Sequence, residues 1–129
     1  MLQPQCSPEV DDALRDGLPI VAMESTIYSN LGLPSPANRD ALERCNAAIR
    51  GHGAVPAVVA VLDGVVRVGL EEGEFERILG AARKAAERDV PVAVAQGWAF
   101  GATTVSASVA IAAAVGIEVF ATGGIGGVH

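Results

Sequence analysis

Apolar runs alternate with helical patterns along this chain. Residues 7–17 predict a helix, because Ser7 suits the N-cap, Pro8 suits the first turn and Gly17 suits the C-terminal stop. Short runs of apolar residues bounded by turn signals predict buried strands. These runs are residues 19–23, 55–62, 65–68, 91–96 and 117–122.

The second helix and the hairpin after it have clear boundary signals. Ser35-Pro36 repeats the pattern of a cap followed by proline, and we expect a helix from there to about Arg50. Asp63-Gly64 separates the apolar runs 55–62 and 65–68. Both central residues of a type I′ turn need positive φ, which this pair tolerates, so the sequence predicts a β-hairpin.

The second half of the chain is less sharply marked. Residues 71–79 predict a helix, and residues 81–88 are again helix-prone, so one kinked helix and a helix followed by a turn both fit. Residues 97–101 predict a loop. Residues 105–115 predict a helix that is apolar nearly all round, and we therefore expect it to be buried.

The order of the predicted elements is α, β, α, β-hairpin, α, β, α, β. Such alternation predicts a mostly parallel sheet with helices on its faces and one antiparallel hairpin. The last strand leads into a glycine-rich segment at residues 123–127. Ligands of α/β sheets lie beyond the carboxyl ends of the strands. We therefore expect residues 1–129 to be the N-terminal part of one longer domain, incomplete at the C-terminus.

The composition agrees with that expectation. The chain has 129 residues, of which 50% are hydrophobic, and its mean hydropathy is +0.38, which is apolar for a small soluble protein. Either the chain is part of a larger α/β domain with strands buried on both faces, or it packs against copies of itself. The glycine-rich segment at the end favours the first explanation.

Charge and cysteine content limit the function. The net charge is −6, and the nine basic residues form no run, which argues against nucleic acid as a partner. The longest apolar segment, residues 105–115, is shorter than the roughly 20 residues of a membrane helix. Cys6 and Cys45 belong to no CxxC or metal-ligand pattern, so we expect reduced thiols in a cytoplasmic protein.

Glu24 is the strongest candidate for catalysis. It follows the apolar run 19–23 and precedes Ser25-Thr26. A carboxyl group at the end of a buried strand is partly desolvated, which favours its protonated form and lets it donate a proton near neutral pH. The alternative is a structural carboxylate that caps an N–H group or pairs with an arginine.

Two further places invite a binding role. Residues 101–105 lead into a helix N-terminus, where Thr103 or Thr104 is the cap; anion binding and plain capping both fit. Lys84 is the only lysine, and a solvated helix residue and a phosphate contact both fit. His52 suits a structural role at a helix end. Loop residues on the expected side of the site without an assigned role are Tyr28, Asn30 and Trp98.

Five motifs resemble those of pseudouridine-5′-phosphate glycosidases, the family that also contains indigoidine synthase A-like proteins. In chain order they are Met23-Glu24-Ser25-Thr26-Ile27, Gly53-Ala54-Val55-Pro56-Ala57, Arg88-Asp89-Val90-Pro91, Gly101-Ala102-Thr103-Thr104-Val105 and Phe120-Ala121-Thr122-Gly123-Gly124-Ile125-Gly126-Gly127-Val128-His129. The resemblance covers about residues 7–129, and the last motif is highly specific.

The resemblance implies a three-layer α/β/α sandwich on a mixed sheet, a homotrimer and a divalent metal, typically manganese. It implies the reversible conversion of pseudouridine 5′-phosphate and water to uracil and ribose 5-phosphate. Glu24 matches the proton donor, Lys84 matches a substrate-binding lysine, and Val105 matches a substrate-contacting position just after Thr103 and Thr104.

The family opens the ribose ring and forms a Schiff base between a lysine and the sugar C1′, because an iminium group withdraws electrons from the bond to be broken. That lysine and the metal-binding aspartate are expected beyond His129, so this chain alone is expected to be inactive. The alternative hypothesis is a non-catalytic α/β module that binds a nucleotide or phosphate and ends at His129.

Overall fold

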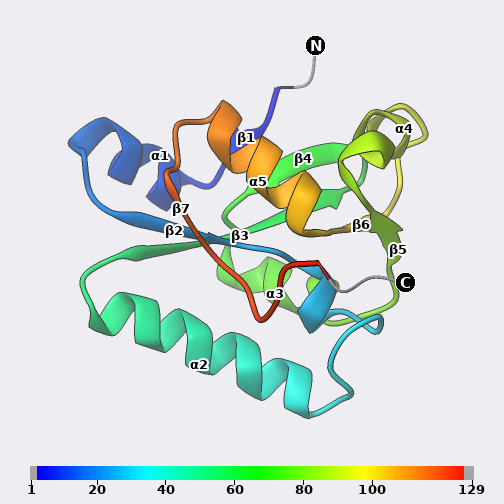
Figure 1. The fold of residues 1–129 in the computed structure, drawn as a ribbon, viewed down its shortest axis with the longest axis horizontal. Helices are drawn as coiled ribbons and strands as arrows, with labels where there is room; N and C mark the ends of the chain where they lie inside the picture. Colours follow the sequence, from blue (N-terminus) through cyan, green and yellow to red (C-terminus); the bar gives the residue numbers. More distant parts are fainter. Residues whose placement is uncertain (1–2, 127–129) are drawn as a thin grey trace.

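The long strand β3 (Val55–Leu62) is the axis of the sheet in the computed structural model, which describes residues 3–126 (Figure 1). The first half of β3 pairs in parallel with β2 (Ile20–Met23), and its second half pairs antiparallel with β4 (Val65–Val68). β7 (Val119–Ala121) extends the sheet beside β2, and β1 (Gln5–Cys6) extends it beside β4.

A second antiparallel neighbour lies along the same half of β3. β6 (Phe100–Thr103) pairs with residues 60–62 of β3, and β5 (Arg83–Ala85) pairs in parallel with β6. Because β4 occupies the other edge of β3, β6 must share an edge with β2. Four of the six pairings within residues 3–126 are parallel, so the predicted mixed, mostly parallel sheet is confirmed.

Helices cover both faces of this sheet (Figure 1). α1 (Pro8–Asp16) and α5 (Val105–Ala114) lie on one face, and α2 (Ala37–Gly51) lies on the other. Side chains alternate along a strand, so Val59 and Val61 join the core under α1 and α5, whereas the residues beside them join the core under α2. The three-layer sandwich expected from the sequence is confirmed.

Several local signals act as predicted. The backbone N–H of Val10 donates to the Ser7 hydroxyl at 3.3 Å, and Gly17 ends α1 with a φ of 70°. Asp63 and Gly64 turn between β3 and β4 with φ values of 50° and 75°. The predicted cap, stop and hairpin are therefore all present.

The prediction of a strand at residues 91–96 is wrong. Residues 91–95 belong to the helix α4 (Val90–Ala95), with Pro91 in its first turn, Gln96 as its C-cap and Gly97 just beyond. A short apolar run fits a buried strand and a half-buried helix equally well. The spacing of the buried residues Val90 and Ala93 is helical.

The helix-prone reading of residues 81–88 is also wrong. The predicted helix at 71–79 forms as a 3₁₀ turn, η2 (Glu72–Glu74), followed by the short helix α3 (Phe75–Ile78). The chain then enters β5 and another 3₁₀ turn, η3 (Glu87–Asp89). The predicted loop at 97–101 contains the start of β6. Pairing between β5 and β6 determines the conformation of this region. Helix propensity describes single residues and takes no account of such pairing.

The start of α2 differs from its prediction. Pro36 occupies the N-cap position without a side-chain cap, and the peptide bond between Ser35 and Pro36 is cis. Ser35 is therefore one residue too early to cap the helix. The helix still ends near Gly51, as expected.

The expectation that the apolar helix at residues 105–115 is buried holds for only one side of α5. Ala107, Ser108, Ile111 and Ala112 are buried, but Val109 is 44% exposed. The sheet covers only one side of the helix. The other side faces away from the sheet, although its residues are also small and apolar. No helix within residues 3–126 is long and apolar enough to cross a membrane.

Gly64 provides a test of the hairpin. A Cβ at this position would lie 2.9 Å from the Cα of Gly97. The alanine that carries it would also have to keep the positive φ of Gly64. We expect Gly64→Ala to lower the free energy of unfolding of the full-length protein by about 1–3 kcal/mol, measured by urea denaturation. Gly73→Ala, where a Cβ meets nothing within 4 Å, is the control and should change stability little. Equal stability of the two variants would contradict this account of the turn.

Candidate functional site

The site forms where two strands meet end to end on one edge of β3. Met23, the last residue of β2, lies beside Val58, and Ala102 of β6 lies beside Ala60. The two strands run toward each other, so their carboxyl ends converge at Val59. The sequence predicted a site beyond carboxyl ends of parallel strands, but this junction of oppositely directed strands was not predicted.

A buried hydroxyl network fills the gap between the two strand ends. The Thr103 hydroxyl donates to the Val59 carbonyl at 2.6 Å, and the Thr103 backbone N–H donates to the Ser25 hydroxyl at 2.9 Å. Because Thr103 has given its only hydroxyl proton to Val59, the hydroxyls of Ser25 and Ser108 donate to its oxygen, at 3.2 and 2.9 Å. The side chains of Ser25, Thr103 and Ser108 have no exposure to solvent.

A hollow of about 1160 Å³ opens beside this junction. Its walls include Glu24, Lys84, Thr104 and Val105. Glu24 directly follows β2, Lys84 lies on β5, and Thr104 and Val105 form the start of α5. The structure thus brings together four of the five residues that the sequence predicted for the site. Thr103 is not among the lining residues, because it lies behind the wall in the buried network. The other lining residues are Thr26, Ala86, Glu87, Arg88, Asp89, Ser106, Gly124, Ile125 and Gly126.

Glu24 is half-buried and is held by one residue that the sequence analysis left without a role. The hydroxyl of Thr122 donates to Glu24 Oε1 at 2.5 Å. Thr122 directly follows β7, and the parallel pairing of Met23 with Ala121 brings the two side chains together. The end-of-strand motif contained Thr122, but its contact with Glu24 depends on β2 and β7 being neighbours.

Tyr28 lies behind Glu24, on the α2 side of the sheet. Its hydroxyl donates to the sulfur of Met23 at 3.5 Å. Burial raises the pKa of Tyr28 above its ordinary value, and the Cys45 thiol and the charge of Glu24 raise it further. Tyr28 is therefore a neutral core residue at physiological pH, and it contributes an apolar wall behind the carboxyl group.

The hollow also contains groups that suit an anion. Lys84 is exposed on β5, and Arg88 follows in η3. Thr104 is the N-cap residue of α5 but makes no side-chain cap, so its hydroxyl does not compete for the first backbone N–H groups of the helix. A carboxyl group facing cationic side chains and a helix N-terminus can bind a phosphorylated ligand and exchange a proton with it.

The residues near the hollow do not fit a manganese site. Within residues 3–126, no group of three or more His, Cys, Asp or Glu side chains is placed to hold a metal ion. Glu24, Glu87 and Asp89 all line the hollow but form no such group.

The loop residues that lacked a role have structural contacts. Arg83 lies 3.8 Å above the ring of Trp98, and the Ala82 N–H donates to the Asn30 side-chain oxygen at 3.0 Å. The ring of His52, at the end of α2, lies 2.8 Å from the Ala48 carbonyl. The predicted structural role of His52 at a helix end is in keeping with this contact.

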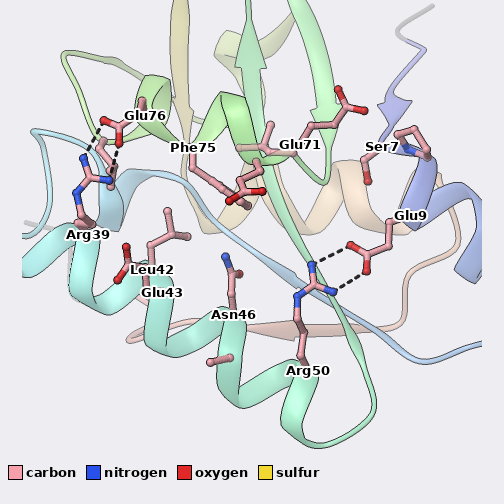
Figure 2. A pocket seen from close by; sticks show the side chains of 15 residues that line it. Ser7, Glu9, Arg39, Leu42, Glu43, Asn46, Arg50, Glu71, Phe75 and Glu76 are labelled. Carbon is pink, nitrogen blue, oxygen red and sulfur yellow. Dashed lines mark hydrogen bonds and ion pairs between the residues drawn. The ribbon is translucent and has the colours of Figure 1, made fainter.

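A second hollow, of about 900 Å³, lies between α2 and the η2–α3 segment (Figure 2). Ion pairs cross it at both ends, from Arg39 to Glu76 and from Arg50 to Glu9, as Figure 2 shows. Its cationic side chains are thus already paired. None of the residues that the sequence predicted for catalysis or binding lines it.

Residues 9–129 match the family described as indigoidine synthase A like protein. This chain belongs to that family. A pseudouridine-5′-phosphate glycosidase of Rhodospirillum centenum is 52% identical over 123 residues, which are 95% of this chain and 38% of the relative. The Escherichia coli glycosidase of the same name is 50% identical over 129 residues, which are 97% of this chain and 40% of that protein.

Two solved structures of relatives have the same fold. An indigoidine synthase A-like protein from Thermotoga maritima has a TM-score of 0.85 at 35% identity, over 99% of this chain and 41% of its own. The prealnumycin C-glycosynthase AlnA, solved with ribulose 5-phosphate, has a TM-score of 0.79 at 40% identity, over 98% of this chain and 40% of its own. The chain thus spans about 40% of the length of these relatives. Residues 127–129 of the glycine-rich family motif lie outside the described residues.

The buried network provides a test of the junction. We expect Thr103→Val to destabilise the full-length protein by about 1–3 kcal/mol, because the Val59 carbonyl and two serine hydroxyls lose a buried partner. Thr104→Val removes an exposed hydroxyl of the next residue and should change stability by less than about 0.5 kcal/mol. Urea denaturation measures both effects. A Thr103→Val protein as stable as the wild type would show that the network does not hold the strand ends together.

Proposed function

We propose that the full-length protein containing this chain is a pseudouridine-5′-phosphate glycosidase. It converts pseudouridine 5′-phosphate and water reversibly to uracil and ribose 5-phosphate. The observation that carries the proposal is the convergence of Glu24, Lys84, Thr104 and Val105, from separate parts of the chain, on one hollow. Identities of about 50% to glycosidases of this name support the same reaction.

Glu24 is assigned the role of proton donor. Its carboxyl group is half-buried at the rim of the hollow and has a hydrogen-bond donor, Thr122, on one oxygen. Two oxygens allow such a group to keep one structural hydrogen bond and still exchange a proton with a ligand. In the proposed reaction Glu24 gives its proton to the ribose ring oxygen as the ring opens, regains one from the lysine amine that attacks C1′, and gives that proton to the departing base.

Lys84 and the start of α5 are assigned the binding of the substrate. An exposed lysine and the free N–H groups of a helix N-terminus suit a phosphate group. Val105 is assigned an apolar contact with the substrate, and Thr104 a hydroxyl contact. Thr103, expected from the sequence to contact substrate, is assigned the support of this wall from behind. The ribulose 5-phosphate bound to AlnA supports a pentose phosphate as the ligand class.

The remaining assignments rest on the family resemblance. They are a Schiff-base lysine and a metal-binding aspartate outside residues 1–129, manganese as cofactor, a homotrimer and a cytoplasmic location. We also propose that residues 1–129 are the N-terminal part of one domain and lack activity by themselves. The 40% share of each relative that the chain covers supports this proposal.

The reaction is tested by incubating the full-length protein with pseudouridine 5′-phosphate and manganese and measuring uracil release by chromatography. We expect release by the wild type and a decrease of about 10²-fold or more in kcat for Glu24→Gln, which cannot donate a carboxyl proton. Glu43→Gln, in the second hollow, is the matched control and should retain full activity. Absence of uracil would overturn the proposed function, and an active Glu24→Gln enzyme would remove Glu24 from its role.

The phosphate assignment is tested with Lys84→Gln. The loss of a cationic contact should raise KM for pseudouridine 5′-phosphate about tenfold or more, with a smaller change in kcat. KM values for both enzymes come from initial rates of uracil release. An unchanged KM would contradict the assignment. Tight phosphate or nucleotide binding by residues 1–129 alone, without catalysis by the full-length protein, would favour the non-catalytic module instead.

A further inference from the structure

One hydroxyl connects Glu24 to the glycine-rich turn across the hollow. The Thr122 oxygen lies 2.5 Å from Glu24 Oε1 and 3.1 Å from the carbonyl oxygen of Gly124, and the Gly124 N–H donates to it at 3.3 Å. Gly124 and Glu24 both line the hollow. Thr122 is therefore shared between the carboxyl group and the main chain of the turn.

The hydroxyl has one proton and two acceptors within reach, so it donates to one of them at a time. When Glu24 is ionised, the carboxylate is the stronger acceptor and takes the hydrogen bond. When Glu24 is protonated, its own O–H can donate to the Thr122 oxygen, and the Thr122 proton is then free to turn toward the Gly124 carbonyl. The direction of the Thr122 hydroxyl thus depends on the protonation of Glu24.

The surrounding fold keeps the three groups together. Parallel pairing of β2 with β7 sets Met23 beside Ala121, and Glu24 and Thr122 are the next residues of the two strands. Gly124 follows within two residues of Thr122 and contacts it through both its N–H and its carbonyl. A change in the protonation of Glu24 can therefore alter the hydrogen bonds of the turn through the single hydroxyl of Thr122.

We propose that Thr122 is a positioning residue for Glu24 and that it couples the protonation state of this carboxyl group to residues 123–126. The hydroxyl donates to the ionised carboxylate at the rim of the hollow, and it donates to the Gly124 carbonyl instead when the carboxyl group is protonated. This role rests on the proposed function in so far as Glu24 is the proton donor. The hydrogen bonds that carry the coupling exist independently of the reaction.

The kinetic test compares Thr122→Val with Thr122→Ser in the full-length protein. Valine keeps the shape and removes the hydroxyl, so kcat should fall about tenfold or more while KM changes by less than about twofold. Serine keeps the hydroxyl and should restore most of kcat. Loss of activity in both variants, or a change confined to KM, would overturn the positioning role.

The coupling is tested without turnover, by the amide resonance of Gly124 in protein labelled with ¹⁵N-glycine. Glu24→Gln places a neutral N–H donor beside Thr122 and should shift the Gly124 resonance in the wild-type background. The same substitution should leave it unchanged when Thr122 is valine. Equal shifts in the two backgrounds would overturn the coupling.

Thr26→Val is the matched control, because Thr26 lines the same hollow but its hydroxyl donates to the Thr103 carbonyl at 2.8 Å, with the Ala102 carbonyl at 3.3 Å. It should leave the response of Gly124 to Glu24→Gln intact. If the wild type releases no uracil, the proposed function fails, and the resonance experiment still decides whether Thr122 couples Glu24 to the turn.

Discussion

The hydrogen bond from the Thr103 hydroxyl to the Val59 carbonyl closes a break in the sheet, and the candidate site depends on it. β2 and β6 share one edge of β3 and run toward each other, so neither strand supplies a ladder partner for Val59. A buried carbonyl without a partner costs about 1–3 kcal/mol. The threonine side chain takes the place of a strand partner, so the two strand ends can meet while the Val59 carbonyl keeps a hydrogen bond.

That meeting of strand ends explains why the candidate residues converge. Residues just beyond the end of a strand are no longer covered by neighbouring strands and helices, so they can face solvent. Here the residues after two strand ends line the same hollow. β5 aligns Lys84 with Ala102 at the end of β6, and Thr104 starts α5 directly after it. A rigid buried layer of hydroxyls thus lies directly behind a wall of exposed binding groups. Such support keeps reactive groups in place without occupying the hollow.

Glu24 shows how the two faces of the sheet contribute differently to the site. On the α2 side it is backed by Tyr28, whose burial keeps the phenol neutral. Beside it, the hydroxyl of Thr122, directly after β7, donates to the carboxyl group, and Lys84 and Arg88 line the same hollow. The carboxyl group is therefore neither fully desolvated nor locked in an ion pair. A group that must both lose and gain a proton suits such an intermediate environment.

The sequence alone determined the features that depend on neighbouring residues: the cap and stop of α1, the Asp63-Gly64 hairpin, the buried strand β3 and the position of Glu24 at the end of β2. The family resemblance also identified Lys84 and Val105. Tertiary structure decided β5, β6 and α4, because a short apolar or charged run becomes strand or helix according to what it packs against. It also decided the partners of Glu24 and Thr103, which lie 98 and 44 residues away in the sequence. Contacts over such distances follow from strand order, which local patterns of polar and apolar residues do not encode.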